Sequence, residues 1–118
     1  MQLPENLTQR IDAFTIHVKE LVNKYWQDHG WITIPPSYQA EFLSAKWCRI
    51  NVVENGKVSS VYCFVCLQDG YTKSLGSLKM GDIHKAATFK APAKHSRGSV
   101  FAEDFNKCAN PFGIVYLR

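Results

Sequence analysis

The sequence predicts a single α+β domain in which a long N-terminal helix packs on a small antiparallel β-sheet. Three observations predict it. Apolar residues recur at helical spacing near the N-terminus, an Asn55-Gly56 pair separates two strand-like runs, and 46% of the 118 residues are hydrophobic. The length is too short for two ordinary domains, but the apolar content is sufficient for one core. We therefore expect residues 1–118 to form one domain.

The N-terminal helix is predicted by apolar residues at spacings of three and four, which share one face of a helix. Asn6, followed by Gln9 three residues later, matches an N-terminal cap, and Gly30 matches a C-terminal stop. We therefore expect an amphipathic helix between Asn6 and Gly30 whose apolar face consists of Leu7, Ile11, Phe14, Val18, Leu21 and Tyr25.

A β-hairpin is predicted over residues 46–67. Before it, residues 31–34 suggest a short extended segment that Pro35-Pro36 ends, and a loop is expected to about residue 44. Asn55-Gly56 is the strongest short hairpin signal, because both central positions of a type I′ turn need a positive φ. A two-residue turn without irregularity pairs Val53 with Val58 and, further along, Arg49 with Tyr62.

This register gives the two faces of the hairpin different chemistry. One face is apolar and is expected to pack on the helix; it consists of Cys48, Ile50, Val52, Val61, Cys63 and Val65. The other face is aromatic and basic, like the base-stacking surfaces of single-strand binding proteins. It consists of Trp47, Arg49, Asn51, Tyr62 and Phe64. Alternatively, residues 71–98 or a partner subunit cover this second face.

The C-terminal half gives weaker signals. Residues 68–80 are rich in glycine and serine and predict a loop, whereas residues 83–89 predict a third strand. Residues 90–98 predict another loop, because Pro92 disfavours helix in the residue before it and Gly98 permits an unusual turn. A short helix is expected within residues 100–109, and a last strand over residues 113–117.

The four cysteines are expected to be reduced and buried. They are Cys48, Cys63, Cys66 and Cys108. Residues 1–10 show no secretion signal, and no run approaches the roughly 20 apolar residues of a membrane helix. Cys63 and Cys66 form a C-x-x-C, but in a strand residues three apart point to opposite faces and cannot hold one ion. We therefore expect no disulfide, no metal and no cofactor.

Positive charge is concentrated in one segment. The formal net charge is +4. Residues 73–97 carry six basic residues against Asp82 alone, which gives +5 for that segment. Such an excess is typical of a surface that meets a phosphate-rich or acidic partner, although a solvated basic loop has the same composition.

Within this segment, small residues allow close approach of the backbone, and basic side chains can neutralise phosphates. We expect phosphate contacts from Lys79, Lys85, Lys90, Lys94, Ser96 and Arg97. Arg49 and Tyr62 are expected to assist by stacking. His84 and His95 are secondary candidates, since they gain positive charge below neutral pH.

The run GDIHKAATFKAPAKHSRGSVF, residues 81–101, resembles a stretch that recurs near the C-terminus of small bacteriophage-encoded proteins of unassigned function. The resemblance covers this run and a hairpin-like segment upstream. It implies a viral gene product that acts in the cytoplasm of a bacterial host or is carried in a virion. It assigns no catalytic role to any residue.

Together these patterns indicate a non-catalytic accessory protein of phage type that binds nucleic acid or another polyanion through a basic loop. Two alternatives stay open. One is a protein-interaction role, either as a virion component or as an inhibitor of a host protein. The other is a small phosphoesterase or nuclease that uses Asp82, His84, His95 and Ser96, with Lys90 or Arg97 stabilising the developing charge.

Overall fold

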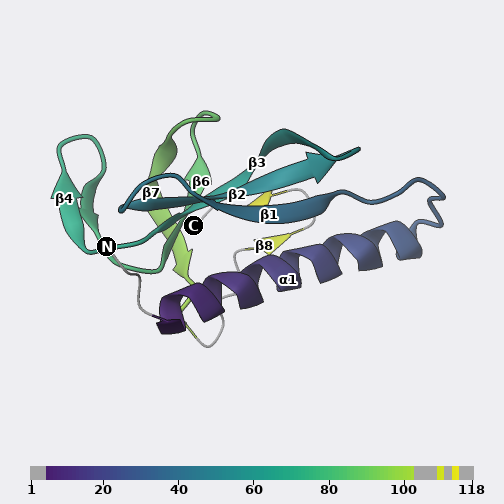
Figure 1. Ribbon diagram of the computed structural model, residues 1–118, viewed down its shortest axis with the longest axis horizontal. Helices are drawn as coiled ribbons and strands as arrows, with labels where there is room; N and C mark the ends of the chain where they lie inside the picture. Colours follow the sequence, from purple (N-terminus) through teal and green to yellow (C-terminus); the bar gives the residue numbers. More distant parts are fainter. Residues whose placement is uncertain (1–4, 103–108, 111–112, 115–118) are drawn as a thin grey trace.

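A computed structural model describes residues 5–102, 109–110 and 113–114 and confirms the α+β class (Figure 1). The helix α1 (Glu5–Asp28) lies along one face of a five-stranded sheet whose order is β1-β2-β3-β6-β7. All neighbouring strands are antiparallel. The strands are β1 (Ser37–Phe42), β2 (Trp47–Glu54), β3 (Lys57–Cys66), β6 (Asp82–Ala86) and β7 (Pro92–Ser99). Two small hairpins accompany the sheet, β4 (Gly70–Thr72) with β5 (Gly76–Leu78) and β8 (Ala109–Asn110) with β9 (Gly113–Ile114).

The helix matches its prediction except at its start and on one flank. It begins at Glu5, so Asn6 lies inside the helix and the predicted cap was wrong. Val22 is buried where Leu21 was expected, because the packed face drifts slightly around the helix. Gly30 ends the helix with φ +63°, and the Gly30 and Trp31 N–H groups donate to the carbonyls of Gln27 and Trp26. Among the described residues, no helix is long and apolar enough to cross a membrane.

The β2–β3 hairpin turns at Asn55-Gly56, as predicted, with φ values of +54° and +76°. The predicted register holds at the Val53–Val58 pair and was wrong beyond it, because two register shifts add residues to β3. Arg49 therefore pairs with Phe64, and Tyr62 falls at an irregularity and turns toward the helix.

Three further segments between α1 and β6 differ from their predictions. Residues 37–42 form the edge strand β1 where a loop was expected, whereas residues 31–34 form no strand. Residues 70–78 form the β4–β5 hairpin.

The predicted loop at residues 90–98 is mostly strand β7. Pro92 is its first residue and lies at the sheet edge, where the missing N–H is tolerated. The predicted third strand ends earlier than expected, at Ala86. Of the predicted helix at residues 100–109, residues 103–108 lie outside the described residues. Of the predicted last strand, Gly113–Ile114 is strand β9 and residues 115–117 are likewise outside the described part.

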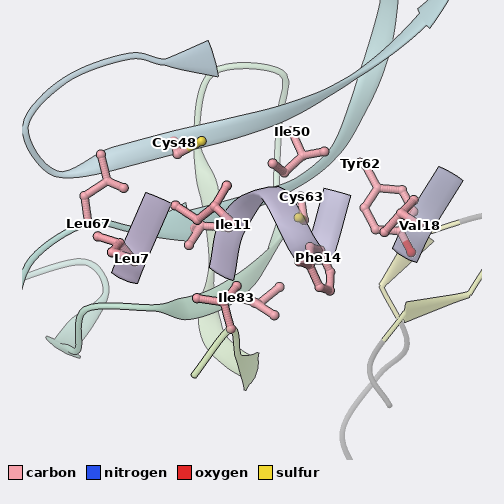
Figure 2. Close-up of a cluster of buried hydrophobic side chains, with 12 residues drawn as sticks. Leu7, Ile11, Phe14, Val18, Cys48, Ile50, Tyr62, Cys63, Leu67 and Ile83 are labelled. Carbon is pink, nitrogen blue, oxygen red and sulfur yellow. The ribbon is translucent and has the colours of Figure 1, made fainter. Parts of the chain in front are cut away.

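The main core lies between α1 and the sheet (Figure 2). Phe14 meets the Tyr62 ring edge-on at 6.4 Å between centroids. Cys48 and Cys63 are fully buried in the same cluster, with Ile50, Val65 and Ile83. The chain thus uses these two thiols as small apolar core groups.

Burial raises the pKa of the Cys48 thiol to about 12. We expect this thiol to make the fold sensitive to alkali. Above the ordinary thiol pKa of 9.0 the unfolded chain releases the proton while the fold retains it, so stability falls as the pH rises from 9 toward 12. The loss from Cys48 should reach ~1.4 kcal/mol by about pH 10. Urea unfolding of the wild type and of Cys48→Ala at about pH 8 and about pH 10 checks this. Equal losses in the two proteins would contradict it.

Candidate functional site

The predicted aromatic and basic face of the sheet is not an open platform. Figure 1 shows the turn of the β6–β7 hairpin on the side of the sheet away from α1, and Phe89 of that turn contacts Arg49 of β2. Arg49 is only 9% exposed and Phe64 only 1%. Tyr62 packs in the helix-side core. The prediction that Arg49 and Tyr62 stack on a ligand therefore fails, because both side chains are buried within the fold.

Arg49 holds the turn of the hairpin against the sheet. Its guanidinium donates to the Phe89 carbonyl at 3.1 Å and lies 4.2 Å from the centre of the Phe89 ring. It also donates to Asn51 Oδ1 at 2.7 Å and to Glu41 Oε1 at 3.0 Å. One planar cation thus donates to three acceptors and also contacts an aromatic ring.

Glu41 completes this network from the edge strand. Its carboxylate accepts from Asn51 Nδ2 at 2.8 Å as well as from Arg49. The hydrogen bonds from Asn51 and Arg49 lower the pKa of Glu41. Glu41, Asn51 and Arg49 therefore form a charged support beneath Phe89.

His84 is buried rather than available to a ligand. It is 2% exposed, its Nδ1 lies 2.8 Å from the Ala93 carbonyl, and its ring meets Trp47 edge-on at 5.3 Å. Its Nε2 is buried without a hydrogen-bond partner among the described residues. The side chain of His95 lies outside the described part of the chain.

The remaining predicted contacts separate into exposed and half-buried residues. Lys79, Lys90 and Lys94 are exposed, whereas Lys85 and Arg97 are half-buried. The Ser96 hydroxyl donates to the Gly98 carbonyl at 2.9 Å, so it stabilises the irregular part of β7. The hairpin therefore presents Lys90 and Lys94 most openly.

Phe89 is the residue that the sequence analysis did not select. It lies in a turn closed by hydrogen bonds between the backbones of Thr88 and Ala91, and it stays 48% exposed beside Lys90. In the sequence it is the one large apolar residue between Ile83 and Val100. An isolated aromatic residue among small and basic residues is the sequence feature that could have identified Phe89 as a candidate site residue.

A groove of about 370 Å³ opens beside Phe89. It lies between residues 59–61 of β3 and residues 86–89 of the hairpin. The groove exists because β3 and β6 pair only at Phe64–His84 and Val65–Ile83 and then diverge. Ser59, Ser60 and Thr88 line it together with small apolar residues and Phe89. The Ser59 hydroxyl donates to the Val52 carbonyl at 3.2 Å.

Of the residues proposed for a hydrolase, Asp82, His84 and Ser96 each have a backbone group as a hydrogen-bond partner. His84 lies opposite Ser96 in the β6–β7 register, yet Ser96 bonds to Gly98 and His84 to Ala93. Asp82 accepts from the Lys79 N–H, and burial raises the pKa of its carboxyl. Across the described ranges, no group of three or more His, Cys, Asp or Glu residues is placed to hold a metal ion.

A protein-family model covers most of the chain. Residues 2–110 match a family model described as "Family of unknown function (DUF7717)". No curated protein and no solved structure matches the chain. The residues of the hairpin must therefore be interpreted from their own geometry.

Proposed function

The chain belongs to the DUF7717 family of unknown function, and we propose that it is a non-catalytic accessory protein that binds nucleic acid or another polyanion through the β6–β7 hairpin. The observation that carries this proposal is the exposure of Lys90 in the turn and of Lys94 on β7, with the exposed ring of Phe89 next to Lys90. Lysines neutralise phosphates, and an aromatic ring offers a face for a base.

The charge of the hairpin supports the same function. From Ile83 to Ala102 the sequence contains no acidic residue, so nothing in this stretch repels an approaching phosphate. Lys79 adds an exposed positive charge just before β6. Lys85 and Arg97, which are half-buried, contribute to the positive potential of the hairpin.

Phe89 and the adjoining groove favour single strands over duplexes. Arg49 lies against the ring of Phe89, which leaves the exposed part of the ring free to stack with an unpaired base. Ser59 and Ser60 line the groove and offer hydroxyl oxygens that can accept from base edges, although the Ser59 hydroxyl proton is donated to the Val52 carbonyl. In this proposal the protein acts in a bacterial host or in a virion, which rests on the resemblance of residues 81–101 to phage-encoded proteins.

Charge reversal tests the proposal. We expect Lys90→Glu combined with Lys94→Glu to weaken binding of single-stranded DNA and RNA by about tenfold or more at low salt. The slope of log affinity against log salt should decrease by about 1.4, since each lost phosphate contact contributes about 0.7 on a single strand. Fluorescence titration with labelled oligonucleotides at several salt concentrations measures both quantities.

The matched control carries the same change of net charge elsewhere. Lys24 and Lys46 are exposed and lie outside the hairpin, so Lys24→Glu combined with Lys46→Glu should leave most of the salt slope intact. Equal effects of the two double variants would mean that binding depends on net charge alone, and the hairpin would lose its assigned role.

A protein-interaction role is the second candidate. Ile32 and Ile34 are 99% and 92% exposed. Exposed apolar side chains of this kind commonly mark contact surfaces. Absence of nucleic-acid binding at low salt would favour this candidate over the polyanion proposal.

A further inference from the structure

The two edge strands of the five-stranded sheet differ in how they are protected. β7 begins with Pro92, exposes Lys94 and pairs with β6 through two register shifts, all of which hinder pairing with another strand. β1 pairs with β2 over six residues without a shift, and it contains neither proline nor lysine. Its one charged residue, Glu41, is bonded to Arg49 and Asn51. Within the described part of the chain no strand pairs with the outer side of β1, so this edge can accept another strand.

The backbone of β1 presents alternate residues to this edge. The Leu43 N–H donates to the Trp47 carbonyl at 3.0 Å, which identifies Leu43 and Trp47 as a hydrogen-bonded pair of the β1–β2 ladder. In an antiparallel ladder such pairs alternate, so the groups of Ser37, Gln39 and Glu41 point toward β2. The N–H and C=O groups of Tyr38, Ala40 and Phe42 consequently point outward.

We infer that β1 pairs with the β1 of a second copy of this chain, antiparallel and centred on Ala40, so that two five-stranded sheets form one continuous sheet. This register places Tyr38 of one copy opposite Phe42 of the other and Ala40 opposite Ala40. All three outward residues then form hydrogen-bonded pairs, and each pair exchanges two N–H···O bonds. The inference is independent of the proposed polyanion binding.

The side chains match in the same register. Tyr38, Ala40 and Phe42 lie on the same face of β1, and Tyr38 and Ala40 pack there against the helix-side core. Tyr38 of one copy and Phe42 of the other therefore form an aromatic cross-strand pair on this face. On the other face Gln39 lies opposite Glu41, so an amide meets a carboxylate. No two like charges face each other. The occupant that fits this edge is therefore a second β1 strand.

Exposed apolar residues flank both ends of β1. Ile32 and Ile34 precede it, while Phe42 and Leu43, 46% and 40% exposed, lie at its other end. Antiparallel pairing brings Ser37 of one copy opposite Leu43 of the other. Residues 31–36 of one copy then approach residues 43–46 of the other, so apolar surface that a monomer exposes becomes covered in the dimer.

The first test is the oligomeric state in solution. We expect sedimentation of the full chain to show a concentration-dependent dimer, and Ala40→Pro to shift it to monomer. Proline at position 40 removes an outward N–H and leaves the bonds to β2 in place. Hydrogen exchange gives a position-specific readout in the wild type. The amides of Tyr38, Ala40 and Phe42 should gain protection as the protein concentration rises, while those of Gln39 and Glu41 should change little.

Substitutions at Gln39 provide a matched pair with opposite expected effects. Gln39 is exposed. Gln39→Glu places a carboxylate opposite Glu41 at two symmetric positions and should weaken the dimer by about tenfold, whereas Gln39→Lys should strengthen it by a similar factor. A monomer at all concentrations, or a dimer that Ala40→Pro and both Gln39 variants leave unchanged, would overturn the inference. The same result would leave open a different protein partner for the β1 edge.

Discussion

Gly81→Ala is expected to lower the free energy of unfolding by about 3 kcal/mol, through backbone strain and a steric clash together. Gly81 has φ +93°, which an L-residue rarely adopts. A Cβ at this position would lie 2.5 Å from Cδ2 and 2.7 Å from Cε2 of Phe101. The backbone cannot easily move, because the Gly81 N–H donates to the Cys66 carbonyl and its carbonyl accepts from the Val100 N–H.

Two other glycines separate the two causes. Gly76 has φ +78° with open space around it, so Gly76→Ala should show the strain alone, about 1 kcal/mol. Gly70 has open space and no positive φ, so Gly70→Ala should be almost neutral. Chemical denaturation measures all three. A Gly81→Ala loss no larger than that of Gly76→Ala would contradict the clash with Phe101.

Arg49→Ala is expected to reduce the free energy of unfolding by about 3 kcal/mol, because removal of this buried cation leaves several of its hydrogen-bond partners unsatisfied. The Asn51 amide oxygen and the Phe89 carbonyl each lose a donor, and the Phe89 ring loses its contact with the guanidinium. Arg49→Lys should recover only part of this loss, since an ammonium cannot reproduce the planar fork. Lys57→Ala, at an exposed position, should change stability by less than about 0.5 kcal/mol.

Acid unfolding gives an independent readout of the same network. A lowered pKa at Glu41 stabilises the fold above the ordinary carboxyl pKa, and this stabilisation is lost as the pH falls through the lowered value. Without Arg49 the pKa of Glu41 should move back toward its ordinary value, so the acid-induced loss of stability should become smaller. An unchanged acid limb in Arg49→Ala would show that the ion pair between Arg49 and Glu41 does not act in solution.

Phe89 connects this support to the proposed function. Arg49 is buried and holds the turn of the β6–β7 hairpin against the sheet. In the polyanion proposal it is a positioning residue and not a ligand contact. A ring fixed in this way loses little conformational entropy when a base stacks on it. The polyanion proposal therefore depends on exposed residues of the turn, Phe89 and Lys90, and on Lys94 of β7.

Where local sequence rules acted alone, the prediction from sequence succeeded. The helix follows from apolar spacing, and the turn at Asn55-Gly56 follows from the need for positive φ at two adjacent residues. Gly30 ends the helix for the same conformational reason. Each of these features depends on residues that are close together in the sequence, so the local sequence is sufficient to predict it.

For the candidate site, the structure decides which residues are exposed, and their binding role stays a prediction. The basic residues Lys79, Lys90 and Lys94 are exposed as expected. Arg49, Tyr62 and His84 are buried, which charge and aromatic character in the sequence do not reveal. Tyr62 lies in the core because of a register shift in β3, and the residues of the hairpin turn do not predict this shift.

By itself, the sequence determined the fold class, the long helix, the position of the hairpin turn and the concentration of positive charge in residues 73–97. Only the tertiary structure decided that β1 and β7 are edge strands and that Arg49 supports Phe89. Strand pairing and burial depend on contacts between residues far apart in the chain. Arg49 and Phe89 are 40 positions apart, and local propensity contains no information at that distance.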